Sequence, residues 1–464
     1  SKNAVIVGGS MAGMVAARVL AGHFERVTIV ERDRLPVEPD YRPGVPQAFQ
    51  AHFLIAKGRL LLEQLFPGLD DTLAAAGAPL VDLVNDGHMH FGAGLMPRGP
   101  SDALVRCATR ITLECEVRKR VRELPNVHII ENAHAVALHV SANNERIQGV
   151  QLDKRIEDAS NVPPHLDAEL VVDASGRRSR APEWLTALGY QAPKVINVDG
   201  HVSYATRLYE EIPLPRGTRG LWVFSRVPDT PRLGAVFKVE GGRSMVFLGG
   251  IGKQHGAPTD DESYLEFARS LIDPIIYEHL RDAKPLSKAR GYRQADNQWH
   301  QYAALERMPE GFVPLGDGLC AFNPVYGQGM TVAALEALAL GDELATGGLD
   351  GIALRAQRRF EKIVAPAWMF ATGEDYRWAT TEGPPAGYQA RVSHAYVDHV
   401  LDLAMREPKV AARLVEVGQM LRPLSALASP RILLFVLGRV LTGKKPSQWG
   451  RSAELRRQDK LTGS

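Results

Sequence analysis

The feature that most constrains the fold is the stretch VIVGGSMAG at residues 5–13. Its apolar start predicts a buried strand, and after the glycine turn residues 14–20 have the apolar spacing of a helix. A second predicted strand, residues 26–31, ends in Glu31. This order is typical of a dinucleotide-binding unit, in which the turn approaches the pyrophosphate and an acid roughly 20 residues further on accepts a hydrogen bond from a ribose hydroxyl. We therefore expect an α/β fold with a Rossmann-type domain.

The turn departs from the usual G-x-G-x-x-G pattern at its middle position, where Ser10 replaces glycine. Gly8 supplies the tight turn, and Gly13 permits close packing of helix and strand. The Ser10 side chain is small enough for a phosphate to approach, and its hydroxyl can donate to a phosphate oxygen. The cofactor contacts predicted in this part of the chain are Gly8, Ser10, Met11, Ala12, Gly13, Glu31, Arg32 and Arg42.

Composition limits the class of protein. A chain of 464 residues is too long for one ordinary core and indicates two or three domains. A formal charge of +2 gives no reason to expect nucleic acid or an anionic membrane surface as the main partner. The three cysteines, Cys107, Cys115 and Cys320, lack metal-ligand spacing and favour a reduced, cytoplasmic setting. No apolar run approaches the ~18 residues of a membrane span.

Two later stretches identify the cofactor by resemblance. DASGRRSR at residues 173–180 follows a predicted buried strand and resembles the second fingerprint of FAD-dependent monooxygenases, although Ala174 stands where that family most often has glycine. GFVPLGD at residues 311–317, followed by NPVYGQGM at residues 323–330, resembles the third fingerprint. The resemblance covers roughly residues 4–345 and implies bound FAD.

The residue types of these stretches suit a flavin. Asp317, at a predicted strand end, can accept hydrogen bonds from the ribityl chain. The helix that begins near Gly327 to Gly329 can face its free N–H groups and positive end toward the N1/O2 edge of the ring, where negative charge gathers on reduction. The further cofactor contacts that the resemblance implies are Arg110, Asp173, Gly316, Asp317, Pro324, Gly327, Gly329 and Met330. Arg110 resembles the family arginine that lies against the flavin or its pyrophosphate, but its position also suits a solvated helix residue.

A fourth stretch favours a subgroup. RPGVPQA at residues 42–48, with His52, Gly58 and FPGL at residues 66–69, resembles actinobacterial flavin monooxygenases that include polyene epoxidases of polyether biosynthesis. Those relatives usually have Arg-His where this chain has Phe49-Gln50, so the loop becomes more apolar. Aromatic hydroxylases more often carry a histidine shortly after Gly-Asp. This chain has GLCA at residues 318–321 instead, which favours the epoxidase-like subgroup.

The expected architecture combines a discontinuous Rossmann-type FAD-binding domain with an antiparallel β-sheet substrate domain and a helical C-terminal region. A helix is expected over about residues 50–66. Residues 432–437, ILLFVL, followed by Arg439, Lys444 and Lys445, predict a helix packed on the body, with a peripheral membrane contact as the alternative. The predicted segments are 1–75, 105–188 and 301–347 for the FAD-binding domain, 76–104 and 189–300 for the substrate domain, and 348–464 for the C-terminal region.

Candidate substrate and catalytic residues are fewer. Phe49, Trp222, Phe224, Phe237 and Phe247 could line an apolar substrate pocket, although core packing explains each equally well. His52, with Lys57, is a weak candidate for a proton relay, and the alternative is a helix surface position. No other catalytic residue is assigned. His88 and His90 have no evident Cys or carboxylate partner, so no metal is expected.

The resemblance implies a monooxygenase that inserts one oxygen atom of O2, through a flavin C4a-hydroperoxide, into a large apolar substrate. Epoxidation of a polyene or polyketide alkene in secondary metabolism is favoured over ring hydroxylation. Electrons would come from NADPH or NADH, directly or through a separate flavin reductase. The alternatives are a flavin-dependent halogenase, whose Trp-x-Trp-x-Ile-Pro stretch is missing from this sequence, a reductase of isoprenoid double bonds, and a non-catalytic flavoprotein that binds a lipid-like ligand.

Overall fold

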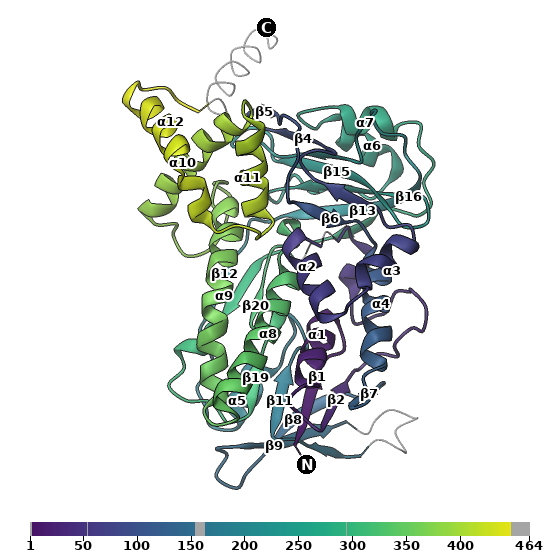
Figure 1. Cartoon of the computed structure of the whole chain (residues 1–464), viewed down its shortest axis with the longest axis vertical. Coiled ribbons are helices and arrows are strands. Elements are labelled where there is room, and N and C mark those ends of the chain that lie inside the picture. The colour runs from purple at the N-terminus through teal and green to yellow at the C-terminus, as the bar shows by residue number, and fades with distance from the viewer. Residues whose placement is uncertain (1, 53, 154–162, 294, 447–464) are drawn as a thin grey trace.

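The computed structural model describes residues 2–446 except 53, 154–162 and 294. Residues 154–162 of the second predicted FAD-binding segment and residues 447–464 of the predicted C-terminal region therefore lie outside the described residues. In Figure 1 the N-terminus lies at the lower end of the molecule beside a parallel sheet. The C-terminal helices lie at the upper end, next to a larger sheet.

The parallel sheet has five strands in the order β19 (Phe312–Pro314), β11 (Leu170–Asp173), β1 (Asn3–Val7), β2 (Arg26–Val30) and β7 (Val127–Ile130). Val7 pairs with both Asp173 and Val30, and Asp173 pairs with Pro314. Four strands thus end at one edge, which is where open parallel α/β sheets bind ligands. Strands from three separate stretches of the chain build this sheet. The exact domain boundaries stay a prediction.

Helices α1 (Met11–Leu20), α4 (Arg110–Arg122) and α8 (Gly329–Gly347) pack together beside this sheet. The buried face of α1 is built from small and apolar side chains, because Ala16, Ala17 and Leu20 are inaccessible to solvent. Gly13 is needed for this packing, since a Cβ there would lie 1.8 Å from the carbonyl oxygen of Gly8. Helix α9 (Ile352–Asp375) lies against α8 and extends the core toward the C-terminal helices.

The larger sheet has seven strands in the order β17 (Arg290–Tyr292), β13 (Ser203–Glu210), β16 (Arg243–Gly250), β15 (Arg232–Val239), β14 (Gly220–Val223), β4 (Gly87–Phe91) and β5 (Gly94–Leu95). Its pairs are antiparallel except β14 with β4. Helices α6 (Asp261–Arg269) and α7 (Ile275–Leu280) cover one face. The other face packs on C-terminal helices α10 (Tyr388–Ala404), α11 (Pro408–Gly418) and α12 (Pro430–Leu441). This agrees with the expected antiparallel sheet and helical C-terminal region.

Three smaller sheets and three short helices connect these layers. The sheets are β8 (Ala135–Val140) with β9 (Ile147–Leu152) and β10 (His165–Asp167), β12 (Val195–Val198) with β18 (Asn297–His300) and β20 (Cys320–Ala321), and β3 (Leu80–Asp82) with β6 (Leu104–Arg106). The helices are α2 (Ala56–Leu65), α3 (Leu69–Ala75) and α5 (Ala181–Ala187). Within the described ranges, no helix combines the length and the apolar character needed to cross a membrane.

The helix expected over about residues 50–66 starts later, at Ala56. Gln50 and Ala51 bind the larger sheet instead: the Gln50 side chain donates to the carbonyl of Arg290, and the Ala51 N–H donates to Thr206. The Ala56 N–H, at the start of the helix, donates to the side chain of Gln419. Long-range partners therefore replace the helical hydrogen bonds that the local sequence would permit.

Candidate functional site

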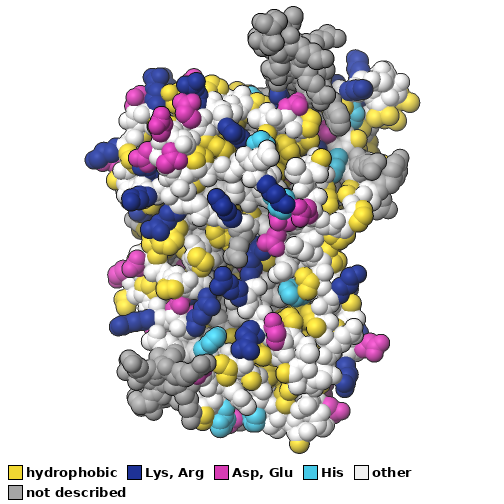
Figure 2. Space-filling view, turned by 180° about the vertical axis from the view of Figure 1, so that it is seen from behind, with side chains coloured by type: hydrophobic (Ala, Val, Ile, Leu, Met, Phe, Trp, Pro, Cys, Tyr) yellow, Lys and Arg dark blue, Asp and Glu magenta, His cyan; other side chains and the backbone are white. Residues whose placement is uncertain are grey.

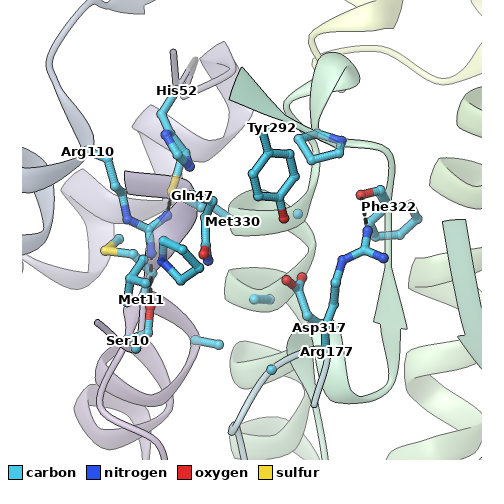
Figure 3. Close-up of a pocket in the computed structure, with 18 of the residues that line it drawn as sticks. Ser10, Met11, Gln47, His52, Arg110, Arg177, Tyr292, Asp317, Phe322 and Met330 are labelled. Atoms are coloured by element: carbon cyan, nitrogen blue, oxygen red, sulfur yellow. Dashed lines mark hydrogen bonds between the residues drawn. The ribbon is translucent and has the colours of Figure 1, made fainter. Parts of the chain in front are cut away.

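Two cavities meet above the Gly8 to Gly13 turn. They have volumes of about 260 Å³ and about 100 Å³. Ser10, Arg32, Ala174 and Arg178 line both, so the two cavities lie next to each other along the carboxyl edge of the parallel sheet. Figure 3 shows the larger cavity, with Ser10, Met11, Gln47, His52, Arg110 and Met330 on one side and Arg177, Tyr292, Asp317 and Phe322 on the other.

The turn is shaped for close approach. Gly8 has φ of +104°, and a Cβ there would lie 2.5 Å from the carbonyl oxygen of Ala174, so only glycine fits. Ser10 precedes α1 without capping it; its Oγ instead accepts a hydrogen bond of 3.0 Å from Arg110 Nη2. The first turn of α1 carries no acidic side chain. The positive end of the helix therefore faces the cavity without a competing negative charge from its own first turn.

Glu31, the predicted ribose acceptor, lines the smaller cavity and is almost fully buried. Its carboxylate accepts hydrogen bonds from the N–H of Gly9 at 2.7 Å and of Asp33 at 2.9 Å. Arg42 Nη1 lies 3.3 Å from the same carboxylate. These bonds fix the acid at the end of β2, beside the turn.

A buried chain of charges joins the two cavities. Arg42 Nη2 lies 2.9 Å from Glu114 Oε1, and Arg110 Nε donates to Glu114 Oε2 at 3.1 Å. Burial alone would raise the pKa of Glu114, but the charges of Arg110 and Arg42 outweigh burial and lower it. Arg110 is buried and lines the larger cavity, so it is not the solvated helix residue of the alternative interpretation.

Asp317 projects into the larger cavity from the loop after β19 (Figure 3). Burial raises the pKa of Asp317, although Arg177 and Arg110 act against this. The loop is held from behind by Glu336 of α8, which accepts the Gly316 N–H at 2.7 Å. Burial raises the pKa of Glu336 to about 8.

The loop before α8 is held by an acid that sequence reasoning missed. Asp375, at the end of α9, accepts hydrogen bonds from Tyr326 at 2.8 Å, Asn297 at 2.6 Å and Asn323 at 3.2 Å. Burial raises the pKa of Asp375 to about 7. Gly327 follows with φ of +68°, turning the chain into α8, and Pro324, Gly327, Gly329 and Met330 line the larger cavity.

Other predicted cofactor residues lie behind the cavity walls. Asp173 is inaccessible to solvent; its carboxylate accepts hydrogen bonds from the Ser175 N–H at 3.1 Å and from the Ser179 hydroxyl. It therefore holds the turn whose residues line the cavity. Gly13 and Gly316 likewise shape the walls without being among the lining residues. Met11, Ala12, Arg32 and Arg42 lie at the cavity surfaces.

His52 lines the larger cavity and lies close to Arg110 (Figure 3). Its Nδ1 is 3.0 Å from the carbonyl oxygen of Gln50. Burial, together with Arg110, lowers the pKa of His52 to about 4, so its ring is neutral at neutral pH. Lys57, its expected relay partner, is not among the residues that line either cavity.

The five predicted substrate-pocket aromatics do not line these cavities. Phe237 is buried against the C-terminal helices, where Trp222 and Phe224 also pack. Phe49 stacks on Tyr41 with ring centroids 3.8 Å apart. Phe247 lies one residue away from the site, because its ring contacts the ring of Tyr204, which lines the larger cavity. The cavity wall instead uses aromatic residues that sequence reasoning missed: Tyr204, Tyr292 and Phe322.

Arg177 was also missed, although it lies inside the second fingerprint-like stretch. It donates to Asp296 Oδ1 at 3.0 Å and to the carbonyls of Asp296 and Phe322, which ties that stretch to the loop after β20. His88 lies 3.2 Å from Asp273. Among the residues that the structure describes, no three His, Cys, Asp or Glu side chains gather as a metal site would require.

No family model matches the sequence. The chain is 33% identical to Protein Rv3254 of Mycobacterium tuberculosis over 426 residues, which are 88% of this chain and 87% of that protein.

Solved structures share the fold at lower identity. The chondrochloren halogenase CndH, a myxobacterial FAD-dependent halogenase, aligns over 90% of this chain and 97% of its own, with a TM-score of 0.61 and 15% identity. PqsL of Pseudomonas aeruginosa, a probable FAD-dependent monooxygenase, aligns over 89% and 99%, with a TM-score of 0.60 and 16% identity. An oxygenase of 2-methyl-3-hydroxypyridine-5-carboxylic acid aligns over 91% and 98%, with a TM-score of 0.58 and 18% identity.

Proposed function

The chain belongs to the family of Protein Rv3254 of Mycobacterium tuberculosis, and from that premise and the site geometry we propose that it is an FAD-dependent monooxygenase. The observation that carries the proposal is that two cavities lie next to each other over one glycine turn, with Glu31 in one and Asp317 in the other. An extended dinucleotide needs this shape, because its two halves lie on opposite sides of its pyrophosphate.

The residues present fit FAD. The adenosine would lie in the smaller cavity with its ribose at Glu31, and the pyrophosphate would lie over Ser10 and the positive end of α1. Asp317 would accept from the ribityl chain, and the flavin ring would meet the loop that begins α8. Arg110 would lie at the junction, where it is already oriented by Glu114.

Bound FAD, once reduced, supplies the chemistry that activates O2 for transfer of one oxygen atom. The chain positions the cofactor and encloses the reaction. His52 is neutral at neutral pH, so it does not add a second positive charge beside Arg110. The tyrosines at positions 204 and 292 line the larger cavity and would lie beside the substrate.

A large, mostly apolar substrate is the finer part of this proposal, with epoxidation of a polyene favoured over ring hydroxylation. Its support is that two cavity arginines already have carboxylate partners: Arg177 pairs with Asp296, and Arg110 pairs with Glu114. These pairings leave neither Arg177 nor Arg110 as a bare positive charge for an acidic substrate, and Arg32 and Arg178, which line both cavities, would face the cofactor instead. Among the similar structures, PqsL has been solved with 2-aminobenzoylacetate.

The electron donor and the cellular setting belong to the same proposal. NADPH or NADH would reduce the flavin, either directly or through a separate flavin reductase. A cytoplasmic location is supported by Cys107, Cys115 and Cys320, which are all free and buried. A halogenase is the second candidate, because CndH shares the fold. It is disfavoured because the Trp-x-Trp-x-Ile-Pro stretch is missing from this sequence.

The test supplies the purified holoprotein with labelled dioxygen, a reduced pyridine nucleotide and a substrate panel of linear polyenes and substituted aromatic rings. Each reaction is run with and without an added flavin reductase, and products are identified by mass. We expect one labelled oxygen atom in a polyene product. A halide-dependent chlorinated or brominated product would identify a halogenase instead. Hydrogenation of a double bond without label would identify a reductase.

A further inference from the structure

Helix α12, near the end of the described chain, exposes an apolar arc. Leu433, Leu434, Leu437, Val440 and Leu441 are all exposed, with Leu434 71% and Leu441 77% accessible. At 100° per residue these five positions fall within one side of the helix. Scattered exposed leucines are ordinary, but a continuous aliphatic arc on one helix marks an interaction surface.

The helix is fixed to the protein by its other side. Ile432 and Val436 are buried in the core that α10 and α11 share with the larger sheet. Arg439 holds the end of the helix, because its Nη2 lies 2.9 Å from Asp402 of α10. The exposed arc is therefore presented by a folded element. Figure 1 places α12 at an outer corner of the molecule, and Figure 2 shows hydrophobic side chains at that corner with basic ones beside them.

The charged residues of the segment that carries the arc are all basic. Residues 430–446 contain Arg431, Arg439, Lys444 and Lys445 and no Asp or Glu. Arg431 and both lysines are exposed. An acid does reach Arg431 from outside the segment, since Glu407 lies 2.9 Å from it. The two lysines follow directly after the apolar arc, at its C-terminal end.

We propose that α12 docks this protein on a membrane surface that contains anionic lipids. The aliphatic arc would enter the interface between headgroups and acyl chains, and Lys444 and Lys445 would meet lipid phosphates. The combination of an outward-facing aliphatic arc and flanking cations matches a lipid surface in both polarity and charge. The proposal goes beyond the proposed enzyme function and does not depend on it.

The test measures sedimentation of the purified full-length holoprotein with vesicles of phosphatidylcholine alone and of phosphatidylcholine with phosphatidylglycerol. We expect sedimentation with the anionic vesicles, weakened by salt. The double variant Leu434→Glu/Leu441→Glu should bind the anionic vesicles at least about tenfold more weakly than the wild type. The control Val37→Glu/Leu286→Glu adds the same charge at two exposed apolar positions elsewhere and should bind as the wild type does.

A second variant, Lys444→Gln/Lys445→Gln, lies after the helix and leaves its packing intact. It should lose most of the preference for anionic over neutral vesicles. The proposal is overturned if the wild type sediments with neither vesicle, or if the lysine variant binds anionic vesicles unchanged. It is also overturned if the wild type is a dimer in solution that the Leu434→Glu/Leu441→Glu variant converts to a monomer, because the arc would then join two copies.

Discussion

The hydroxyl of Tyr326 donates a hydrogen bond of 2.8 Å to the carboxylate of Asp375. Tyr326 directly precedes Gly327, whose turn begins the cavity wall, whereas Asp375 lies at the far end of α9. Asn297 and Asn323 donate to the same carboxylate. One buried acid thus fixes the position of the loop that would face the flavin.

The titration of Asp375 should make stability depend on pH. Its pKa is raised from 3.8 to about 7 by burial, so the folded protein holds a proton between these values that the unfolded chain has lost. The stabilisation is complete below the unfolded pKa and is lost as pH rises through about 7. In the wild type the unfolding temperature should decrease as pH rises through about 7, and in Asp375→Asn this decrease should be smaller.

The measurement is thermal unfolding from pH 6.5 upward. His52, with a pKa lowered from 6.5 to about 4 by burial, acts with the opposite sign near pH 6.5, but it is present in both proteins and cancels in their comparison. Glu336, with a pKa raised to about 8, acts with the same sign, so some slope should remain. Tyr326→Phe is the control, because it removes the hydrogen bond and keeps the titrating carboxyl. An identical slope in the wild type and Asp375→Asn would refute this role.

Arg110→Met should weaken FAD binding. The guanidinium contributes a charged contact at the turn, and loss of a hydrogen bond to a charged group costs roughly 1.5–3 kcal/mol, or about 10- to 150-fold in affinity. Glu114 keeps Arg42 as a partner, so the fold should persist. FAD titration of flavin-free protein measures the loss. Arg120→Met, on the same helix but away from both cavities, should bind FAD normally. Equal affinity for FAD in the wild type, Arg110→Met and Arg120→Met would show that Arg110 does not contact the cofactor.

Asp317→Ala should also lower FAD retention, because a ribityl hydroxyl would lose a charged acceptor worth roughly 1.5–3 kcal/mol. The flavin content after gel filtration gives the result. Asp342→Ala, on the exposed side of α8, is the matched control. Unchanged flavin content in Asp317→Ala would mean that the third fingerprint-like stretch has been misplaced.

Ser10→Gly should change FAD affinity only slightly. The Ser10 hydroxyl binds Arg110, and one hydrogen bond contributes about 0.5–1.5 kcal/mol. Ser10→Val should cost more, because its branched side chain occupies space where the pyrophosphate would pass. Titration with FAD compares the two variants. Equal affinity for glycine and valine would show that the cofactor does not approach the turn closely.

The local parts of the site could be predicted from sequence, and the long-range parts could not. The positions of Gly8 and Glu31 follow from one strand-turn-helix-strand unit, whose geometry is set by neighbouring residues. Asp375 lies 49 residues after Tyr326, its partner, and nothing in the helix sequence marks it as a loop anchor. Tyr204 and Tyr292 meet because β13 pairs with β17, a register that only the folded sheet defines.

The aromatic residues show the same limit. Alternation along the strands indicated which side chains share a face, but not what covers that face. The C-terminal helices cover Phe237, so it became core, whereas Phe247 reaches the cavity through Tyr204. The late start of α2 has a similar cause, because Gln50 and Ala51 find partners on distant strands.

The proposal that FAD spans the two adjacent cavities is tested most directly by identifying the flavin that the purified protein holds. The protein is denatured, and the released flavin is separated by chromatography against FAD and FMN standards and quantified against the chain. We predict FAD in a ratio near one per chain, taken up again by flavin-free protein. Release of FMN alone, or a flavin-free protein that takes up no FAD, would contradict it.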